Sequence, residues 1–328
     1  MKILSLLRAA MFGTALLVTA GASFAQQPKV LNLAFVGRAT APEGIAMTAF
    51  AEEIKTKTNG RIEIRLHPGG ALGGDREVLE GLQIGTVDLT VPSTSIIANF
   101  VPDVQVFDIP FLFRDFDHAQ AVPDGPIGQE ILAKFKAKGL QGLAFGGIGF
   151  RQLTNSKRPV NGPEDVKGLK IRTQENQIHL QVWRALGALP TPMALPEVFT
   201  ALQQGVVDGQ ENPIGAILNN KFGQVQKYLT VTNHAFTPIG FVMAPRAFEA
   251  LSPDDRQLFL DAAKHAMAIC KDEVAKVEKT GIEELRKQGL QIVEKVDTAK
   301  FQELLKGTFA DLGKRFGEAT IARIKDQK

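Results

Sequence analysis

The sequence predicts an α/β fold built as two similar lobes, each with a mainly parallel sheet. Strand-like and helix-like segments alternate along the chain, which is the pattern of parallel β-α-β units. The segment EVLEGLQIGTVDLTV, which begins at Glu77, returns in altered form as EVFTALQQGVVDGQE at Glu197, 120 residues further on. Two copies of a helix, a glycine stop and a strand indicate two halves that face a common site.

The first 25 residues have the features of a secretory signal peptide. Lys2 and Arg8 precede an apolar run over residues 9–20, and Ser23-Phe24-Ala25 offers a small-x-Ala cleavage site. The run is too short for a stable anchor, because a transmembrane helix needs about 18 or more apolar residues. We therefore expect a mature protein that is exported to a bacterial periplasm.

Composition excludes several classes of protein. The formal net charge is +3, and two of the cations belong to the predicted signal peptide, so the near-neutral remainder gives no electrostatic reason to expect nucleic acid as a partner. Cys270 is the single cysteine and cannot form an intrachain disulfide. Charged residues at 22% and apolar residues at 44% exclude a disordered chain. The length after the signal peptide suffices for two domains.

The first half of the chain is predicted to contain three strands and two helices. The strands are expected at residues 30–36, 61–67 and 87–91, and the helices at 42–54 and 77–83. Thr40 and Glu43 have the spacing of a capping box for the first helix. Residues 61–67 alternate with a strict period of two, which is typical of a strand. Gly85 is expected to end the second helix.

The second half is predicted to repeat this order and to end in a long helix. Strands are expected at 142–150, 169–172 and 234–245, a helix at 177–186, an extended Pro-restricted segment at 188–193, and a turn at 208–213. Ser252 is expected to cap a helix whose apolar stripe runs from Phe259 to Val277 at helical spacing. If it continues to about Gln288, this helix would be about 50 Å long and could brace both lobes.

Polar side chains near strand ends are the candidate binding residues, because ligands of open α/β sheets lie outside the carboxyl ends of strands. Arg172 ends a predicted strand, where it fits either a surface ion pair or a guanidinium that grips a carboxylate with two hydrogen bonds. Arg151 follows a glycine-rich run and is a second candidate. Asn212 lies in the segment DGQENP, which fits either a plain loop or a ligand-binding one.

Motifs for catalysis, cofactors and metals are not recognisable in the sequence. The glycine run at 69–74 has no following Lys-Ser/Thr, so it is not a phosphate-binding loop. The five histidines are scattered, which argues against a zinc site, and no Gly-x-Ser-x-Gly elbow is present. We expect no catalytic residues, no metal and no cofactor. The alternative is a periplasmic enzyme, a hydrolase or lyase that acts on an organic acid with Glu77 or Glu211 as base.

Several segments resemble the extracytoplasmic solute receptors of tripartite ATP-independent periplasmic (TRAP) transporters, DctP type. They are FDIPFLFRDFDHA, GFRQLTNSKRPV, PEDVKGLKIR, ALGALPTPM and EVFTALQQGVVDGQENP, in that order. The resemblance implies a two-lobed periplasmic binding protein fold, type II-like, with a long helix spanning both lobes. It divides the chain into lobe I (26–149 plus 238–277), lobe II (150–237 plus 278–305) and a C-terminal helical tail (306–328) that packs on the lobes.

The resemblance also implies a function and a set of ligand contacts. Arg172 matches the family's carboxylate-binding arginine, Arg151 its frequent second arginine, and Asn212 its cleft asparagine. Further contacts are implied for Glu77, Ser93, Thr94, Met193 and Phe236. The expected partners are an organic acid and the small and large membrane subunits of a TRAP transporter. The ligand stays open between a sugar acid such as a uronate, a hydroxy acid, a C4-type dicarboxylate, and an aromatic or branched acid.

Overall fold

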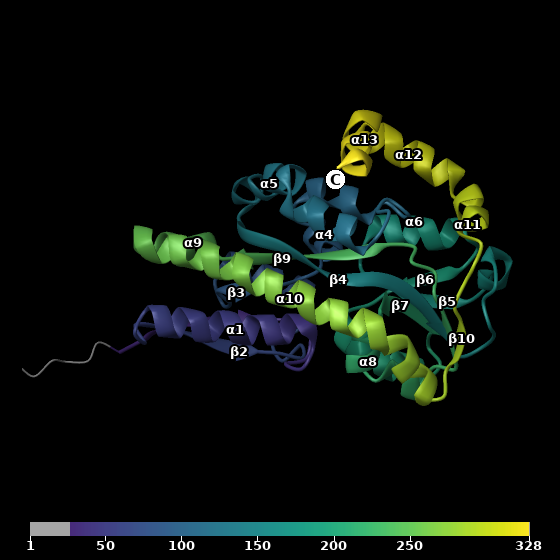
Figure 1. Ribbon diagram of the computed structural model, residues 1–328, viewed down its shortest axis with the longest axis horizontal. Helices are drawn as coiled ribbons and strands as arrows, with labels where there is room; N and C mark the ends of the chain where they lie inside the picture. Colours follow the sequence, from purple (N-terminus) through teal and green to yellow (C-terminus); the bar gives the residue numbers. More distant parts are fainter. Residues whose placement is uncertain (1–26, 328) are drawn as a thin grey trace, which may run out of the picture.

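The computed structural model describes residues 27–327, which form two α/β lobes side by side (Figure 1). The predicted signal peptide, residues 1–25, lies outside the described residues. The strands are β1 (Lys29–Ala34), β2 (Ile62–His67), β3 (Leu89–Thr90), β4 (Gln141–Asn155), β5 (Lys170–Thr173), β6 (Leu189–Pro192), β7 (Gly209–Pro213), β8 (Tyr228–Thr230), β9 (Phe236–Met243) and β10 (Gln291–Val293). The predicted α/β fold class is confirmed.

Helices surround the strands. The α-helices are α1 (Pro42–Lys57), α2 (Asp75–Ile84), α3 (Thr94–Ile97), α4 (Phe116–Asp124), α5 (Pro126–Leu132), α6 (Gln177–Ala185), α7 (Val198–Gln203), α8 (Ile214–Asn219), α9 (Pro245–Glu249), α10 (Pro253–Lys287), α11 (Thr298–Leu304), α12 (Lys306–Phe316) and α13 (Glu318–Asp326). Five short 3-10 helices complete the set: η1 (Pro102–Asp108), η2 (Lys136–Lys138), η3 (Pro163–Val166), η4 (Leu195–Glu197) and η5 (Phe222–Gln224).

The ten strands form one mixed sheet. Eight of them follow the order β2-β1-β3-β9-β4-β7-β5-β6, and β8 pairs with β4 on one side and with β10 on the other. Pairing is parallel at both ends, in β2-β1-β3 and in β7-β5-β6, as the alternation of strands and helices predicts. The two central strands β4 and β9 run antiparallel to each other and to their outer neighbours β7 and β3. The first lobe contains the β2-β1-β3 end with α1 and α2, and the second lobe the β7-β5-β6 end with α6 and α7.

The internal repeat is a structural repeat. Gly85 after α2 and Gly205 after α7 both adopt positive φ, at 86° and 71°. Asp88 then accepts a hydrogen bond from the amide of Asn32 in β1, and Asp208 accepts one from the amide of Lys170 in β5, each at 2.9 Å. The repeated glycine ends a helix, and the repeated aspartate ties the following segment to the adjacent parallel strand.

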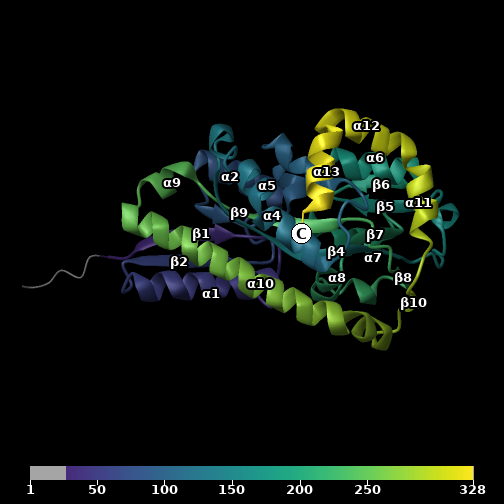
Figure 2. The same cartoon turned by 45° about the horizontal axis from the view of Figure 1, so that its top comes forward.

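The long helix α10 joins the two lobes. It has 35 residues, which corresponds to about 52 Å, and Ser252 caps it by accepting a hydrogen bond from the amide of Asp255. Its buried stripe includes Phe259, Ala266 and Cys270. The helix contacts α1 in the first lobe, β4 in the centre and α8 in the second lobe, and Figure 2 shows it running along both lobes. The predicted brace is confirmed.

Two local predictions are wrong. The N-cap of α1 is Ala41, with no side-chain cap, so Thr40 and Glu43 form no capping box. Thr40 instead donates to Asn219 of the second lobe at 3.3 Å. The segment DGQENP is not a turn, because residues 209–213 form the fully buried strand β7. Pairing with β4 on one side and β5 on the other overrides the weak strand propensity of Gly, Asn and Pro.

The C-terminal tail contacts both lobes. Arg114 donates to the carbonyl of Gln327 at 3.0 Å, and a ring nitrogen of His118 lies 2.8 Å from the carbonyl of Ile324. Gln181 of α6 reaches Asp311 at 3.5 Å. The lobe boundaries given above remain predictions.

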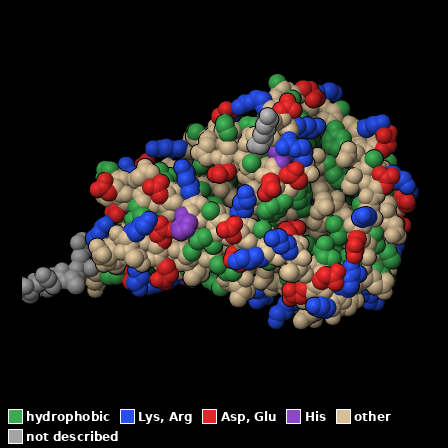
Figure 3. Space-filling model, viewed as in Figure 1, with side chains coloured by type: hydrophobic (Ala, Val, Ile, Leu, Met, Phe, Trp, Pro, Cys, Tyr) green, Lys and Arg blue, Asp and Glu red, His purple; other side chains and the backbone are tan. Residues whose placement is uncertain are grey.

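Charged side chains of both signs are interspersed on the face shown in Figure 3. This agrees with the near-neutral composition, since no large patch of one sign covers that face. Within residues 27–327, no helix is both long enough and apolar enough to cross a membrane.

Replacing Gly205 by alanine tests the helix stop in the second copy of the repeat. A Cβ at this position would meet no atom within 4 Å, so any loss of stability comes from the positive φ alone. We expect Gly205→Ala to lower the free energy of unfolding by about 1–2 kcal/mol in urea titrations. The matched control is Gly307→Ala in α12, which also meets no atom but has no positive φ. It should stabilise by up to about 1 kcal/mol. Equal effects would contradict this explanation.

Candidate functional site

A cavity lies between the two lobes and is partly open to solvent. The first lobe contributes the segment after β1, the start of α2 and Ser93 after β3. The second lobe contributes Arg172 and Gln174 at the end of β5, Met193 after β6, and residues of β7 and α8. The walls are therefore built at strand ends, as the sequence predicts.

Arg172 is a buried cation with one donor left open. Its side chain is 2% exposed, and Nε and Nη2 donate to the carbonyl of Met193 at 2.9 and 2.6 Å. The remaining nitrogen Nη1 is buried and has no hydrogen-bond partner among the described residues. Burial and the nearby Arg151 lower the pKa of Arg172 to about 10, which still leaves it charged near neutral pH. Buried donors are normally satisfied, so an Nη1 without a partner is an unusual feature of the cavity wall.

Arg151 also lines the cavity, but it is held by a buried ion pair. Its guanidinium donates to both carboxylate oxygens of Glu211, and Nη1 donates to the hydroxyl of Thr237 at 2.9 Å. The arginine is 1% exposed and the glutamate 0%. Glu211 therefore neutralises this cation within the protein, and Arg172 is left as the buried cation with an open donor, while the exposed Arg38 also lines the cavity.

Glu211 is further fixed by a ring nitrogen of His234, 3.0 Å from Oε2. Burial acts to raise the pKa of Glu211, but Arg151 together with His179 and His234 holds it well below its usual range. An ionised carboxylate with these partners is a poor candidate for a general base. The alternative enzyme, which uses Glu77 or Glu211 as base, finds no support here, because Glu77 is exposed and lies outside the cavity wall.

Asn212 extends from β7 toward the cavity. Its Oδ1 accepts a hydrogen bond from Arg151 at 3.4 Å, and its Nδ2 donates to Gln210. Gln210 in turn donates to Thr154 at 2.8 Å. These bonds fix the orientation of the amide beside the arginine.

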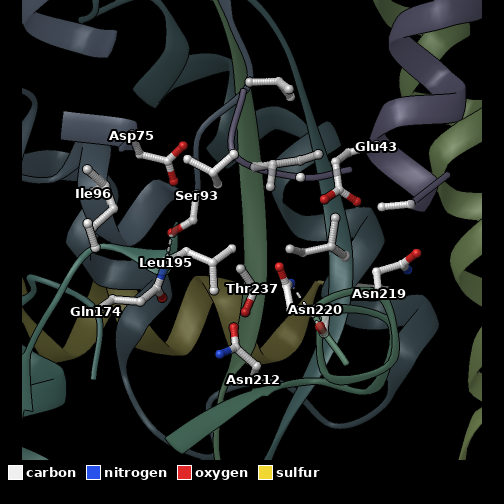
Figure 4. Close-up of a pocket in the computed structure, with 18 of the residues that line it drawn as sticks. Glu43, Asp75, Ser93, Ile96, Gln174, Leu195, Asn212, Asn219, Asn220 and Thr237 are labelled. Atoms are coloured by element: carbon white, nitrogen blue, oxygen red, sulfur yellow. Dashed lines mark hydrogen bonds between the residues drawn. The ribbon is translucent and has the colours of Figure 1, made fainter. Parts of the chain in front are cut away.

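Glu43 and Asp75 are cavity residues that the sequence analysis did not identify. Figure 4 shows both carboxyl groups turned toward the cavity, with Asn212 and Thr237 on the opposite side. Burial raises the pKa of each carboxyl group to about 7. The repulsion between the two also raises the pKa of Asp75, whereas the amide of Ser93 and the charge of Arg172 lower it. Each acid lies at the start of a helix that follows a strand, and this position in the sequence could have identified it as a candidate.

Hydrogen bonds join the lobes around the cavity. Gln174 donates to the hydroxyl of Ser93 at 2.8 Å, and Asn176 donates to the carbonyl of Ser95 at 2.9 Å and to Asp108 at 2.8 Å. These bonds connect the end of β5 in the second lobe with α3 and η1, which follow β3. The lobes are therefore in direct contact beside the cavity.

The structure places five of the eight candidate residues in the cavity wall, namely Arg151, Arg172, Asn212, Ser93 and Met193. Glu77, Thr94 and Phe236 lie outside it. Glu77 is exposed on α2, and Thr94 is buried and donates to the carbonyl of Pro238 at 3.2 Å. Phe236 packs edge-on against phenylalanines of its own core, among them Phe113 and Phe150. Within residues 27–327, no cluster of His, Cys, Asp and Glu is arranged to hold a metal ion.

Comparison with protein families gives one match over most of the chain. The family model of the bacterial extracellular solute-binding protein, family 7 (DctP) matches residues 33–314. A solute-binding protein of Verminephrobacter eiseniae is 44% identical over 283 residues, which cover 86% of this chain and 84% of the relative.

Two solved structures are similar over the full fold. A TRAP periplasmic solute-binding protein of Polaromonas sp. JS666, bound to D-erythronate, is 45% identical with a TM-score of 0.90, and the match covers 92% of this chain and 99% of that one. A TRAP periplasmic solute-binding protein of Bordetella bronchiseptica, with ligand density assigned to pantoate, is 45% identical with a TM-score of 0.89 and the same coverage.

The raised pKa of Glu43 predicts a stability difference that depends on pH. In the folded protein this carboxyl holds its proton up to about pH 7, whereas an ordinary glutamate has released it above pH 4.5. Folded stability is therefore lost as the pH rises through this window. We expect Glu43→Gln to raise the free energy of unfolding by about 1–3 kcal/mol at pH 8 and to have little effect at pH 4.

The measurement is thermal or urea unfolding of the ligand-free protein at both pH values. Glu52→Gln is the matched control, because Glu52 is an exposed acid on the same helix. A Glu43→Gln variant less stable than wild type at pH 8 would show that the carboxylate is stabilising.

Removal of the Glu211 charge tests the buried ion pair. Glu211→Gln leaves Arg151 buried without a counterion, so we expect the free energy of unfolding to fall by about 3–5 kcal/mol. Glu197→Gln, an exposed acid in the same lobe, should change it by less than about 0.5 kcal/mol. Urea denaturation of both variants measures the difference. A loss below about 1 kcal/mol for Glu211→Gln would mean that another group neutralises Arg151.

Proposed function

Because the chain belongs to the bacterial extracellular solute-binding protein family 7, we propose that it captures a small organic acid whose carboxylate lies on Arg172. The chain is a solute receptor and not an enzyme, as its family and structural neighbours are solute-binding proteins. The single observation that supports the carboxylate position is the buried, unpartnered Nη1 of Arg172. A ligand carboxylate supplies the missing acceptor.

The carboxylate is held by a preformed donor. The carbonyl of Met193 fixes the guanidinium from one side, so little side-chain entropy is lost when a ligand binds on the other. Asn212 and Ser93 line the same cavity, and their side chains provide further polar groups around the ligand. Arg151 lines the same cavity, but Glu211 neutralises its charge, and its donors are largely occupied by Glu211 and Thr237.

The receptor delivers its ligand to the small and large membrane subunits of a TRAP transporter. Support comes from family membership and from the two neighbours described as TRAP periplasmic solute-binding proteins. A periplasmic location fits the family and the signal-like residues 1–25. The neighbours' ligands, D-erythronate and pantoate, are both carboxylates that carry hydroxyl groups, which agrees with an organic acid in this cavity.

The proposal is tested by a thermal-shift screen of the ligand-free protein against organic acids, followed by calorimetry. A ligand at about 100 times its Kd should stabilise the protein by about 2.7 kcal/mol. Arg172→Ala removes the buried donor and should weaken binding at least about 100-fold. Arg172→Lys should also lose much of the affinity, since an ammonium group lacks the planar geometry that holds the carbonyl of Met193 and directs Nη1 at the same time.

Arg184→Ala serves as the control, because Arg184 is an exposed arginine on α6. It should bind the same acid with wild-type affinity. Affinities within threefold of wild type for both Arg172 variants would exclude Arg172 from the site. A screen in which no organic acid stabilises the wild type would overturn the proposed function itself.

A further inference from the structure

We propose that the glycine run at residues 69–74 is a lid that docks on the second lobe and controls how fast the ligand leaves the cavity. The lid connects β2 to α2 in the first lobe. Its decisive contact is between Gly70 and Pro196, which precedes α7 in the second lobe. This inference rests on the proposed function, in which a small acid occupies the cavity.

The lid borders the cavity wall. The amide of Gly69 donates to the carbonyl of Gly37 at 2.8 Å, and Gly37 is a cavity residue. Asp75, directly after the lid, is another cavity residue. Leu72 in the middle of the lid is exposed, whereas Gly74 at its end is buried. The lid therefore lies between this part of the wall and the solvent.

The backbone of the lid touches side chains of the second lobe. A Cβ on Gly70 would lie only 2.7 Å from Cγ of Pro196, and a Cβ on Gly74 would lie 3.0 Å from Cβ of Ala194. Ala194 lines the cavity. The two lobes are therefore so close along the lid that they leave no room for a methyl group at Gly70.

Gly69 and Gly70 are glycines for different reasons. Both adopt positive φ, at 71° and 73°, which disfavours any residue with a Cβ. A Cβ on Gly69 would meet no atom within 4 Å, whereas a Cβ on Gly70 would clash with the ring of Pro196. The strain of the positive φ belongs to the loop itself, and it persists when the lobes move apart. The clash with Pro196 exists only when the lid is docked.

The lid is the closely packed part of this edge of the cavity. Beside it, Arg76 Nη1 lies 3.9 Å from the carboxylate of Glu175 in the second lobe, but both side chains are partly exposed, so this ion pair contributes little. A ligand held between two lobes leaves after they separate. Loss of the Gly70 contact should therefore raise the dissociation rate more than it changes the association rate.

The same geometry allows the lid to be locked. A Cβ on Gly70 would lie 3.5 Å from Cβ of Pro196, at the short end of the range of about 3.5–4.5 Å that disulfides span. Cys270, the single native cysteine, is buried. Cysteines introduced at the two positions can therefore be paired with each other by oxidised glutathione.

The first experiment compares the oxidised and reduced forms of the double variant Gly70→Cys/Pro196→Cys, with D-erythronate as the probe. Protein that is oxidised with the probe bound should release it at least about 100-fold more slowly than the reduced protein, as measured by dialysis and mass spectrometry. Both forms carry the same substitutions, so the comparison isolates the lock. A disulfide that does not form, or release rates within threefold of each other, would overturn the lid.

The second experiment separates the clash from the strain in stopped-flow binding. Gly70→Ala should raise the dissociation rate about tenfold or more, because an added methyl group is costly in a packed contact. The matched control is Gly69→Ala, which carries the same strain without the clash and should stay within threefold of wild type. Pro196→Ala removes Cγ, so it should restore the wild-type rate in the Gly70→Ala protein. Thermal unfolding checks that each variant is folded.

The outcomes distinguish the lid from the proposed function. Equal dissociation rates for Gly69→Ala and Gly70→Ala, or no rescue by Pro196→Ala, would overturn the lid and leave the receptor intact. If D-erythronate does not bind the wild type, the acid with the largest effect in the thermal-shift screen replaces it as the probe. The proposed function fails only if no organic acid binds the wild type, and the lid then fails with it.

Discussion

The buried ion pair between Arg151 and Glu211 is the interaction on which the cavity depends. It joins the central strands β4 and β7, whose antiparallel register places Leu153 opposite Glu211 and Arg151 opposite Pro213. Because two opposite charges are buried together, the strand pair is held in one register. The pair also lowers the net positive charge of the site, since Glu211 neutralises Arg151 and leaves Arg172 as the buried cation that has an open donor.

Both lobes contribute charged groups to the cavity. The second lobe supplies the guanidinium of Arg172, and the first supplies Arg38 and the carboxyl groups of Glu43 and Asp75. The lobes are joined by hydrogen bonds between neutral groups, such as Gln174 to Ser93 and Asn176 to Ser95. These bonds do not involve the charged side chains of the cavity. The charged groups therefore remain available to a ligand, and α10 keeps the lobes on a common frame.

Both local predictions that are wrong fall on segments that build the cavity. Glu43 lies at a capping-box position but faces the cavity, and Asn212 lies in a turn-like sequence that forms the buried strand β7. Local rules fail where function or tertiary pairing requires another arrangement. The Gly and Pro content of residues 208–213 favours a turn, but two neighbouring strands supply backbone hydrogen bonds that outweigh this preference.

The sequence by itself determined the alternation of strands and helices, the repeat with its helix stops at Gly85 and Gly205, and the length of α10, because these follow from periodicity and from glycine conformation within a few residues. It also placed Arg172 at a strand end. Only the tertiary structure decided that Arg151 is neutralised while Arg172 keeps an open donor, since Glu211 approaches from 60 residues away. The positions of Glu43 and Asp75 in one wall likewise depend on how two separate helix starts pack against the second lobe, which no local pattern encodes.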